Sequence, residues 1–168
     1  MNRLQNKPLV ILISVLSIVL AVSAAVLLVH VTGAGDRPDK GSFDPYAKEG
    51  RLKGYEDREV PEGDSFHYLL SARPYFRSGA ASGSISAENS PGNEYLMKVE
   101  YTLKDSGQVV YTSGFLKPGW HIASAPLDVA LAKGIYPAIA TITVLEDVTF
   151  EPLSTFTEDI QIFVGKKP

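Results

Sequence analysis

The first fifth of the chain is continuously apolar, whereas most of the remainder is polar or alternates between apolar and polar residues. From Pro8 to Val31 the sequence reads PLVILISVLSIVLAVSAAVLLVHV, 24 residues without Asp, Glu, Lys or Arg. A helix of this length, at about 1.5 Å per residue, reaches roughly 36 Å and exceeds the roughly 30 Å hydrocarbon core of a bilayer. The pattern therefore predicts one transmembrane helix over residues 8–31.

The flanks of this segment predict its orientation. Residues 1–7, MNRLQNK, carry Arg3 and Lys7 and no acid, which favours the cytoplasmic side and places the rest of the chain outside. A cleaved signal peptide is the alternative, with Val22-Ser23-Ala24 as the small-residue cleavage site. The apolar run continues through Val29, beyond the usual apolar region of about 7 to 15 residues, so a retained signal anchor is favoured.

Residues 32–63 show no sustained apolar period and contain six glycines and three prolines. This composition predicts a polar tether between the membrane and a folded domain. The segment Asp44 to Gly50, DPYAKEG, has a composition that would also suit docking on that domain.

From Phe66 onward the period becomes two, as expected for strands. The clearest run is Tyr95 to Leu103, which a turn at Ser90–Asn93 precedes and a hairpin at Asp105–Gly107 follows. The predicted strands are 66–72, 83–88, 95–103, 108–113, 127–131, 136–144 and 156–164. About seven short strands separated by turn signals predict that residues 64–168 form an all-β domain, an antiparallel immunoglobulin-like β-sandwich.

A local motif supports this prediction. Leu131, Gly134 and Tyr136 have the Leu-x-x-Gly-x-Tyr form of a tyrosine corner, in which the tyrosine hydroxyl bonds to backbone upstream. The cysteine pair and core tryptophan of antibody domains are absent, and Trp120 instead follows a Pro118-Gly119 turn.

Composition narrows the function classes. The chain has no Cys, which excludes disulfides, thiol nucleophiles and cysteine-ligated zinc. Beyond residue 35 it carries 14 bases and 19 acids, a net charge of −5 without a basic stripe, so no nucleic-acid partner is expected. Its length suits one domain with an appendage rather than a large multidomain enzyme.

Catalytic and metal-binding signatures are not found. No G-x-S-x-G, S-x-x-K or H-E-x-x-H motif occurs, and the acid pairs, such as Glu146 and Asp147, are typical of solvated loops. We therefore expect no catalytic residues, no cofactor and no metal. The candidate interaction surface consists of aromatic and neighbouring residues that either bind a protein or sugar ligand or cap the ends of the core: Tyr75, Phe76, Trp120 and His121.

Several stretches taken together resemble a group of small exported proteins of Gram-positive anaerobic bacteria that have no known function. These are Pro91 to Leu103, Asp105 to Gly114, Lys117 to Gly119 and Gly134 to Ala138, together with a "DPxAxEGxLxG" motif at Asp44 to Gly54. The resemblance implies a membrane-anchored, exported β-domain and supplies no catalytic residues.

These features favour a non-enzymatic, single-pass membrane module of the cell envelope that mediates protein interaction. Three alternatives remain: a carbohydrate- or wall-binding module, a secreted protein with a cleaved signal peptide, and a hydrolase with an unrecognised carboxylate pair. The strand predicted at 156–164 is also a candidate to accept a strand from another chain.

Overall fold

The computed structural model describes residues 41–60 and 65–168. The predicted cytoplasmic stretch 1–7, the predicted span 8–31 and the first part of the predicted tether lie outside the described residues. Within the described ranges, no helix is long and apolar enough to cross a membrane.

The described chain is built from nine strands. In chain order they are β1 (Lys48–Glu49), β2 (Tyr68–Leu70), β3 (Tyr75–Phe76), β4 (Gly83–Asn89), β5 (Leu96–Leu103), β6 (Val109–Thr112), β7 (Trp120–Ala125), β8 (Gly134–Leu145) and β9 (Pro152–Val164). They form one sheet in the order β1-β7-β4-β3-β9-β8-β5-β6, with β2 paired to β4. The fold class is therefore all-β, as the period-two pattern predicted.

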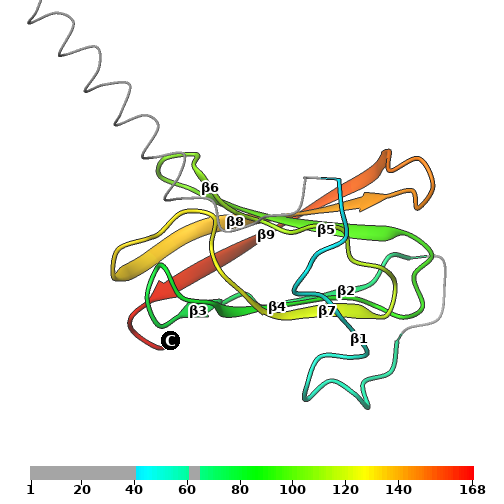
Figure 1. The fold of residues 1–168 in the computed structure, drawn as a ribbon, viewed down its shortest axis with the longest axis horizontal. Coiled ribbons are helices and arrows are strands. Elements are labelled where there is room, and N and C mark those ends of the chain that lie inside the picture. Colours follow the sequence, from blue (N-terminus) through cyan, green and yellow to red (C-terminus); the bar gives the residue numbers. More distant parts are fainter. Residues whose placement is uncertain (1–40, 61–64) are drawn as a thin grey trace, which may run out of the picture. The chain divides into compact units, whose positions relative to one another are not determined.

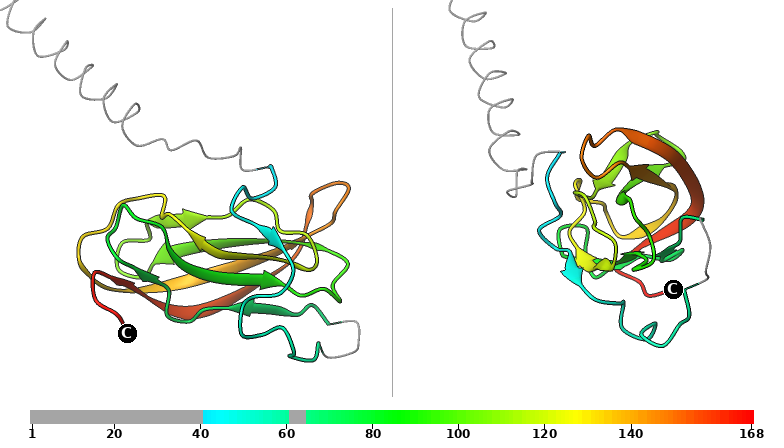
Figure 2. Two further views of the ribbon diagram at one scale, coloured as in Figure 1. Left: turned by 60° about the horizontal axis from the view of Figure 1, so that its bottom comes forward. Right: turned by 90° about the vertical axis from the view of Figure 1, so that its right-hand side faces the viewer.

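The sheet curls so that its two halves face each other (Figures 1 and 2). One half contains β5, β6, β8 and β9, and the other contains β1, β2, β3, β4 and β7. The halves are joined where β3 pairs with the end of β9, Tyr75 to Phe163 and Phe76 to Val164. That pairing is parallel, so the prediction of an exclusively antiparallel sheet is corrected to a mixed one.

The predicted hairpin at Asp105–Gly107 is present, and the strand that precedes it, β5, also pairs with the long strand β8. β5 pairs with β6 across the Asp105–Gly107 turn, in which Gly107 has a φ of +67°, a conformation that glycine adopts at little cost. β5 also pairs with β8 over eight residues, from Leu96 opposite Leu145 to Leu103 opposite Ala138. β8 in turn pairs with β9 along its whole length.

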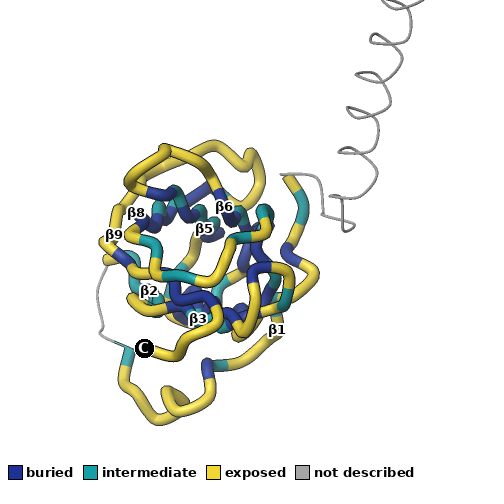
Figure 3. Tube along the Cα trace, turned by 90° about the vertical axis from the view of Figure 1, so that its left-hand side faces the viewer, coloured by how far each residue is buried: buried dark blue, intermediate teal, exposed yellow. Residues whose placement is uncertain are grey.

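The core lies between the two halves and contains the alternating residues that the sequence predicted (Figure 3). On β5 and β8 the fully buried positions include Val99, Tyr101, Ala140 and Ile142. The facing half contributes buried residues from β4 and β7, among them Ile85, Ala87 and Ile122. The predicted strand at 127–131 is wrong, since these residues form a loop. β7 was missed because its sequence, WHIASA, has little apolar alternation.

The predicted tether is also corrected over much of its described length. Residues 43–52, here called the strap, lie on the sheet and contribute β1, which pairs with β7 through Lys48 opposite His121 and Glu49 opposite Trp120. Leu52 at the end of the strap is 5% exposed. The folded domain therefore begins well before residue 64.

Truncating a buried residue of the central strand β8 tests this core. We expect Ile142→Ala to lower the free energy of unfolding by about 2–5 kcal/mol, because the fully buried side chain leaves a cavity. Ile135→Ala on the same strand is the control, because Ile135 is 49% exposed and should change stability by about 0.5 kcal/mol or less. Chemical denaturation of both variants measures the difference, and equal losses would contradict the assigned core.

Candidate functional site

The strap begins with a turn that its own sequence specifies. Asp44 precedes Pro45, and the Ala47 N–H donates to the Asp44 carbonyl at 3.2 Å, which closes the turn with proline at its favoured second position. The Asp44 carboxylate accepts hydrogen bonds from the Tyr46 N–H and the Gly114 N–H, each at 2.8 Å. Asp44 is 8% exposed, so one buried carboxylate both stabilises the turn and attaches it to the domain.

The start of the strap lies directly on the backbone before β7. The Asp44 N–H donates to the Phe115 carbonyl at 3.1 Å, and the Phe115 N–H donates to the Ser42 carbonyl at 2.9 Å. A Cβ atom at Gly114 would stand 2.6 Å from both the Asp44 nitrogen and the Ser42 oxygen. The close approach of the two chains therefore requires glycine at position 114.

The second half of the strap is held by a buried carboxylate of β4. Glu88 is fully buried, and its two carboxylate oxygens accept from the Arg51 Nε at 2.5 Å and from the Leu52 N–H at 2.6 Å. Gly50, with a φ of +102°, allows the chain to turn between β1 and these bonds. The Gly50 carbonyl lies 2.7 Å from the His121 Nδ1, which donates to it.

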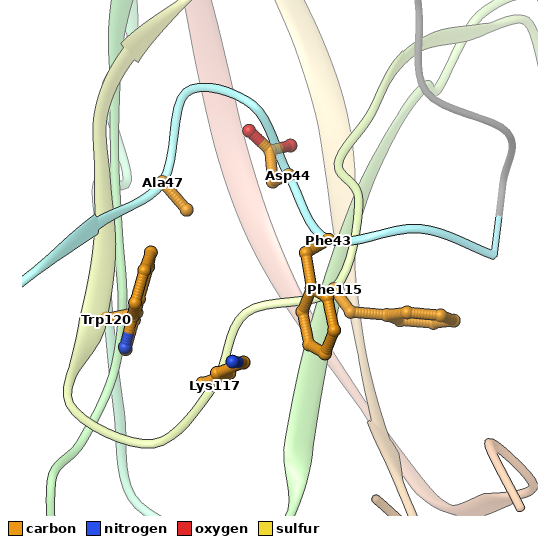
Figure 4. A pocket seen from close by; sticks show the side chains of 6 residues that line it. All are labelled: Phe43, Asp44, Ala47, Phe115, Lys117 and Trp120. Carbon is orange, nitrogen blue, oxygen red and sulfur yellow. The ribbon is translucent and has the colours of Figure 1, made fainter.

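The strap and the chain before β7 enclose an apolar pocket of about 120 Å³ (Figure 4). Its six lining residues are Phe43, Asp44, Ala47, Phe115, Lys117 and Trp120. Trp120 and Phe43 stand on two sides of the pocket with Lys117 between them. The Phe43 and Phe115 rings meet edge to face with centroids 6.4 Å apart.

A single cation lies among these aromatic rings. The Lys117 Nζ is 4.6 Å from the centroid of Phe43 and 5.6 Å from that of Trp120, within the range of cation–π attraction. The Phe150 ring also stacks on Phe115, with the ring centroids 5.1 Å apart. Phe150 has a φ of +59°, an unfavourable value for a bulky residue, so the β8–β9 loop holds it there against local strain.

The structure separates the four residues of the predicted interaction surface. Trp120 lines the pocket and His121 binds the strap beside it, whereas Tyr75 and Phe76 lie at the Gly83 end of β4. Trp120 pairs with Asn89, six positions further along β4 or about 20 Å. Phe76 is fully buried in the core, so it does not contribute to a surface.

The other pocket residues were not identified from the sequence. Phe43 and Ala47 lie in the segment interpreted as a tether, and Phe115 and Lys117 lie in a connection between strands. For Phe43 and Ala47 the signals were the Asp-Pro turn, which directs the path of the chain there, and the composition of Asp44 to Gly50, which suited docking on the domain.

The tyrosine motif adopts the predicted hydrogen bond. The Tyr136 hydroxyl donates to the Ala132 carbonyl at 2.9 Å, across the corner that leads into β8. Leu131 packs against the core at this corner. A Cβ at Gly134 would approach the Tyr136 ring to 3.2 Å, so the small residue leaves space for the ring.

Two titratable groups away from the pocket, Glu146 and Tyr68, have structural partners that shift their pKa. The Glu146 carboxylate accepts from the Thr149 and Val148 N–H groups, and these bonds lower its pKa, the Thr149 bond most. Burial, together with a hydrogen bond to Glu158, raises the pKa of Tyr68 to about 12. Among residues 41–60 and 65–168, no three His, Cys, Asp or Glu side chains are grouped as metal ligands would be.

Comparisons with known proteins add little to this geometry. No family model and no curated protein matches the chain. Among solved structures, a Lactobacillus rhamnosus β-glucuronidase is 22% identical over 58% of this chain, with a TM-score of 0.33. The match spans 15% of that protein, and a likeness this weak carries no argument about fold or activity.

Substituting Gly114 tests whether the strap depends on this close approach. We expect Gly114→Ala to weaken strap docking by about 1–3 kcal/mol, because the added methyl group meets backbone atoms that cannot move aside. Amide hydrogen exchange should speed up at Asp44 and Phe115 while the β8 amides stay protected. Gly41→Ala is the matched control, since its Cβ would meet nothing within 4 Å. Unchanged exchange at Asp44 in Gly114→Ala would contradict the assigned contact.

Proposed function

We propose that this protein is a non-enzymatic, membrane-anchored module of the cell envelope whose pocket binds an apolar side chain of a protein partner. The observation that carries the proposal is the pocket itself, an apolar cavity lined by three aromatic rings at the surface of the domain. Apolar pockets lined by aromatic residues are typical anchors for the few side chains that dominate a protein interface.

The size and lining of the pocket favour an apolar side chain over a sugar. A dry apolar cavity of about 150 Å³ accommodates benzene, so one of about 120 Å³ suits a leucine, valine or similar group. The Lys117 Nζ lies 5.6 Å from the centroid of the Trp120 ring, so the ring already has a cation near it. The Lys117 ammonium group favours a ligand that carries a carboxylate beside the apolar side chain.

We further propose that the domain is an immunoglobulin-like sandwich and belongs with the exported proteins that the sequence resembles. The facing halves of the sheet and the Tyr136 to Ala132 hydrogen bond support the first part. The docked strap supports the second, since the motif shared with that group, Asp44 to Gly54, contains the Asp-Pro turn, the pocket residues Asp44 and Ala47, and the buried Leu52.

Peptide selection on the full chain tests the pocket. Panning a random peptide library should enrich sequences with a leucine or similar residue next to an acid, and Trp120→Ala should weaken their binding by about 2 kcal/mol, roughly 30-fold in Kd. Tyr75→Ala is the matched control and should bind normally, because Tyr75 lies near the other end of β4. Selected peptides that bind Trp120→Ala undiminished would refute a role for this pocket.

The carbohydrate alternative is tested with the same variants on a different ligand. Retention of the full chain on purified cell-wall polymer, abolished by Trp120→Ala, would replace the protein partner with a glycan.

Cell fractionation tests the proposed location. A chain anchored by residues 8–31 should stay with membranes after alkaline carbonate washing, and protease added to intact cells should remove the β-domain but leave an N-terminal tag. Release into the medium, with a mature N-terminus near Ala25, would support the cleaved-signal alternative instead.

A further inference from the structure

The C-terminal strand β9 is paired on only one side along most of its length. β8 follows it from Pro152 to Val164, whereas β3 reaches the opposite edge only at Phe163 and Val164. The first eight residues of β9, Pro152 to Asp159, are all exposed. No other strand of the described chain pairs with them, so this stretch has an unpaired edge. At its far end Tyr68, Leu70 and Ala72 line a groove beside Glu158 and Asp159, and the Tyr68 hydroxyl donates to Glu158 at 2.9 Å.

The backbone of this edge is oriented for pairing. Further along β9, the Gln161 and Phe163 N–H groups donate away from β8, to the carbonyls of Ala72 and Pro74 at 2.9 Å. N–H groups alternate in direction along a regular strand, and the pairing with β8 is regular from Ser154 onward, so residues 155, 157 and 159 point their N–H groups to the same open side. An unpaired row of this kind is a template for a strand of another chain.

The side chains of the edge favour strand pairing as well. Thr155 and Thr157 flank Phe156 symmetrically, and β-branched and aromatic residues are those that strands favour. Phe156 is 38% exposed and stacks on Phe66 with ring centroids 6.4 Å apart. A further ring placed here would therefore extend an apolar cluster that already exists.

We propose that this edge pairs antiparallel with the same edge of a second copy of the chain, with Phe156 opposite the partner's Phe156. The symmetry of Thr-Phe-Thr about Phe156 is the reason to choose a second copy, because a two-fold interface must complement itself. In this register Thr155 lies opposite the partner's Thr157, and Thr–Thr and aromatic cross-strand pairs are both favourable.

The charges of the edge are compatible with this register. Glu158 faces the partner's Ser154, and regular pairing ends at the irregularity between Ser154 and Pro152, so no acid lies opposite another acid within the paired stretch. A register centred on Asp159 would instead oppose two carboxylates, which is unfavourable. The Asp159 carboxylate also has a cation on its own chain, the Lys104 Nζ at 2.6 Å.

Cysteine cross-linking of the full-length chain tests the register directly, because the native sequence has no Cys. In a directly opposed, non-hydrogen-bonded pair the Cα atoms are about 4.5 Å apart, which a disulfide can bridge. Phe156→Cys should therefore form a covalent dimer on mild oxidation. Ser154→Cys on the same strand is the matched control. In this register position 154 lies four residues, about 13 Å, from position 154 of the second copy, so the two cysteines should not cross-link.

A second pair of variants keeps Phe156 in place. Copies carrying Thr155→Cys should cross-link to differently tagged copies carrying Thr157→Cys more strongly than either copy cross-links to itself. Equal cross-linking of Phe156→Cys and Ser154→Cys, or capture of a different protein by both, would overturn the proposal.

A blocking variant completes the test. Thr155→Pro removes an N–H that points to the open side and leaves the hydrogen bonds to β8 in place, so the protein should stay folded. A copy that carries both Thr155→Pro and Thr157→Cys should no longer cross-link to a copy that carries Thr155→Cys alone. Cross-linking of Phe156→Cys that persists in the Thr155→Pro background would likewise overturn the proposed pairing.

Discussion

The buried carboxylate of Glu88 is the constraint on which the arrangement of the strap depends. It lies on β4 in the interior of the domain, with no exposed surface, and its oxygens are bound by the Arg51 guanidinium and the Leu52 N–H. A buried carboxylate without such partners is strongly destabilising, because it loses its hydration and gains no hydrogen bond or ion pair to replace it. The strap is therefore a structural component of the domain, which needs residues 51 and 52 in place to satisfy its own interior.

The pocket is a consequence of this attachment. Asp44 secures the start of the strap through the Gly114 N–H, and Glu88 secures its end. The residues between these two points carry Ala47 past Trp120, while Phe43 lies at the start of the strap against Phe115. Half of the lining thus comes from a segment far from β7 in sequence, and the cavity exists only while the strap is docked.

The sequence predicted those parts of the fold that depend on local pattern. The alternation of β5 and β8 identified buried residues such as Val99 and Ile142, and Gly107 and Tyr136 marked a turn and a corner that the structure contains. For the strap, the composition of Asp44 to Gly50 indicated that the segment could dock, but not where, because two-residue strands such as β1 have no period. Its attachment depends on Glu88, an acid within a short strand, and nothing local distinguishes such an acid from a solvated one.

Several residues of the motif at 44–54 are nevertheless of the types that the docked strap requires. Asp44 supplies the capping carboxylate, and Gly50 and Gly54 take positive φ values of +102° and +88° that other residues adopt only with strain. Leu52 is buried. Each of these positions restricts the residue type for a reason visible in the fold, whereas a free tether would tolerate almost any polar residue at all four.

The edges of the sheet show where the domain is closed and where it remains open. β1 covers the edge of β7, and the Asp128 N–H covers β6 by donating to the Val110 carbonyl at 2.7 Å. Both edges are thus bound by other segments of the same chain, which is how sheets commonly avoid pairing with neighbours. β9 differs, since the middle of its unpaired stretch, Thr155–Thr157, carries β-branched and aromatic residues, while Pro152 and the acids Glu158 and Asp159 flank it. The chain thus covers the edges of β7 and β6 and, among the described residues, leaves the edge of β9 at 152–159 without a paired strand. The side-chain binding pocket and the backbone pairing site therefore lie on different strands of the domain.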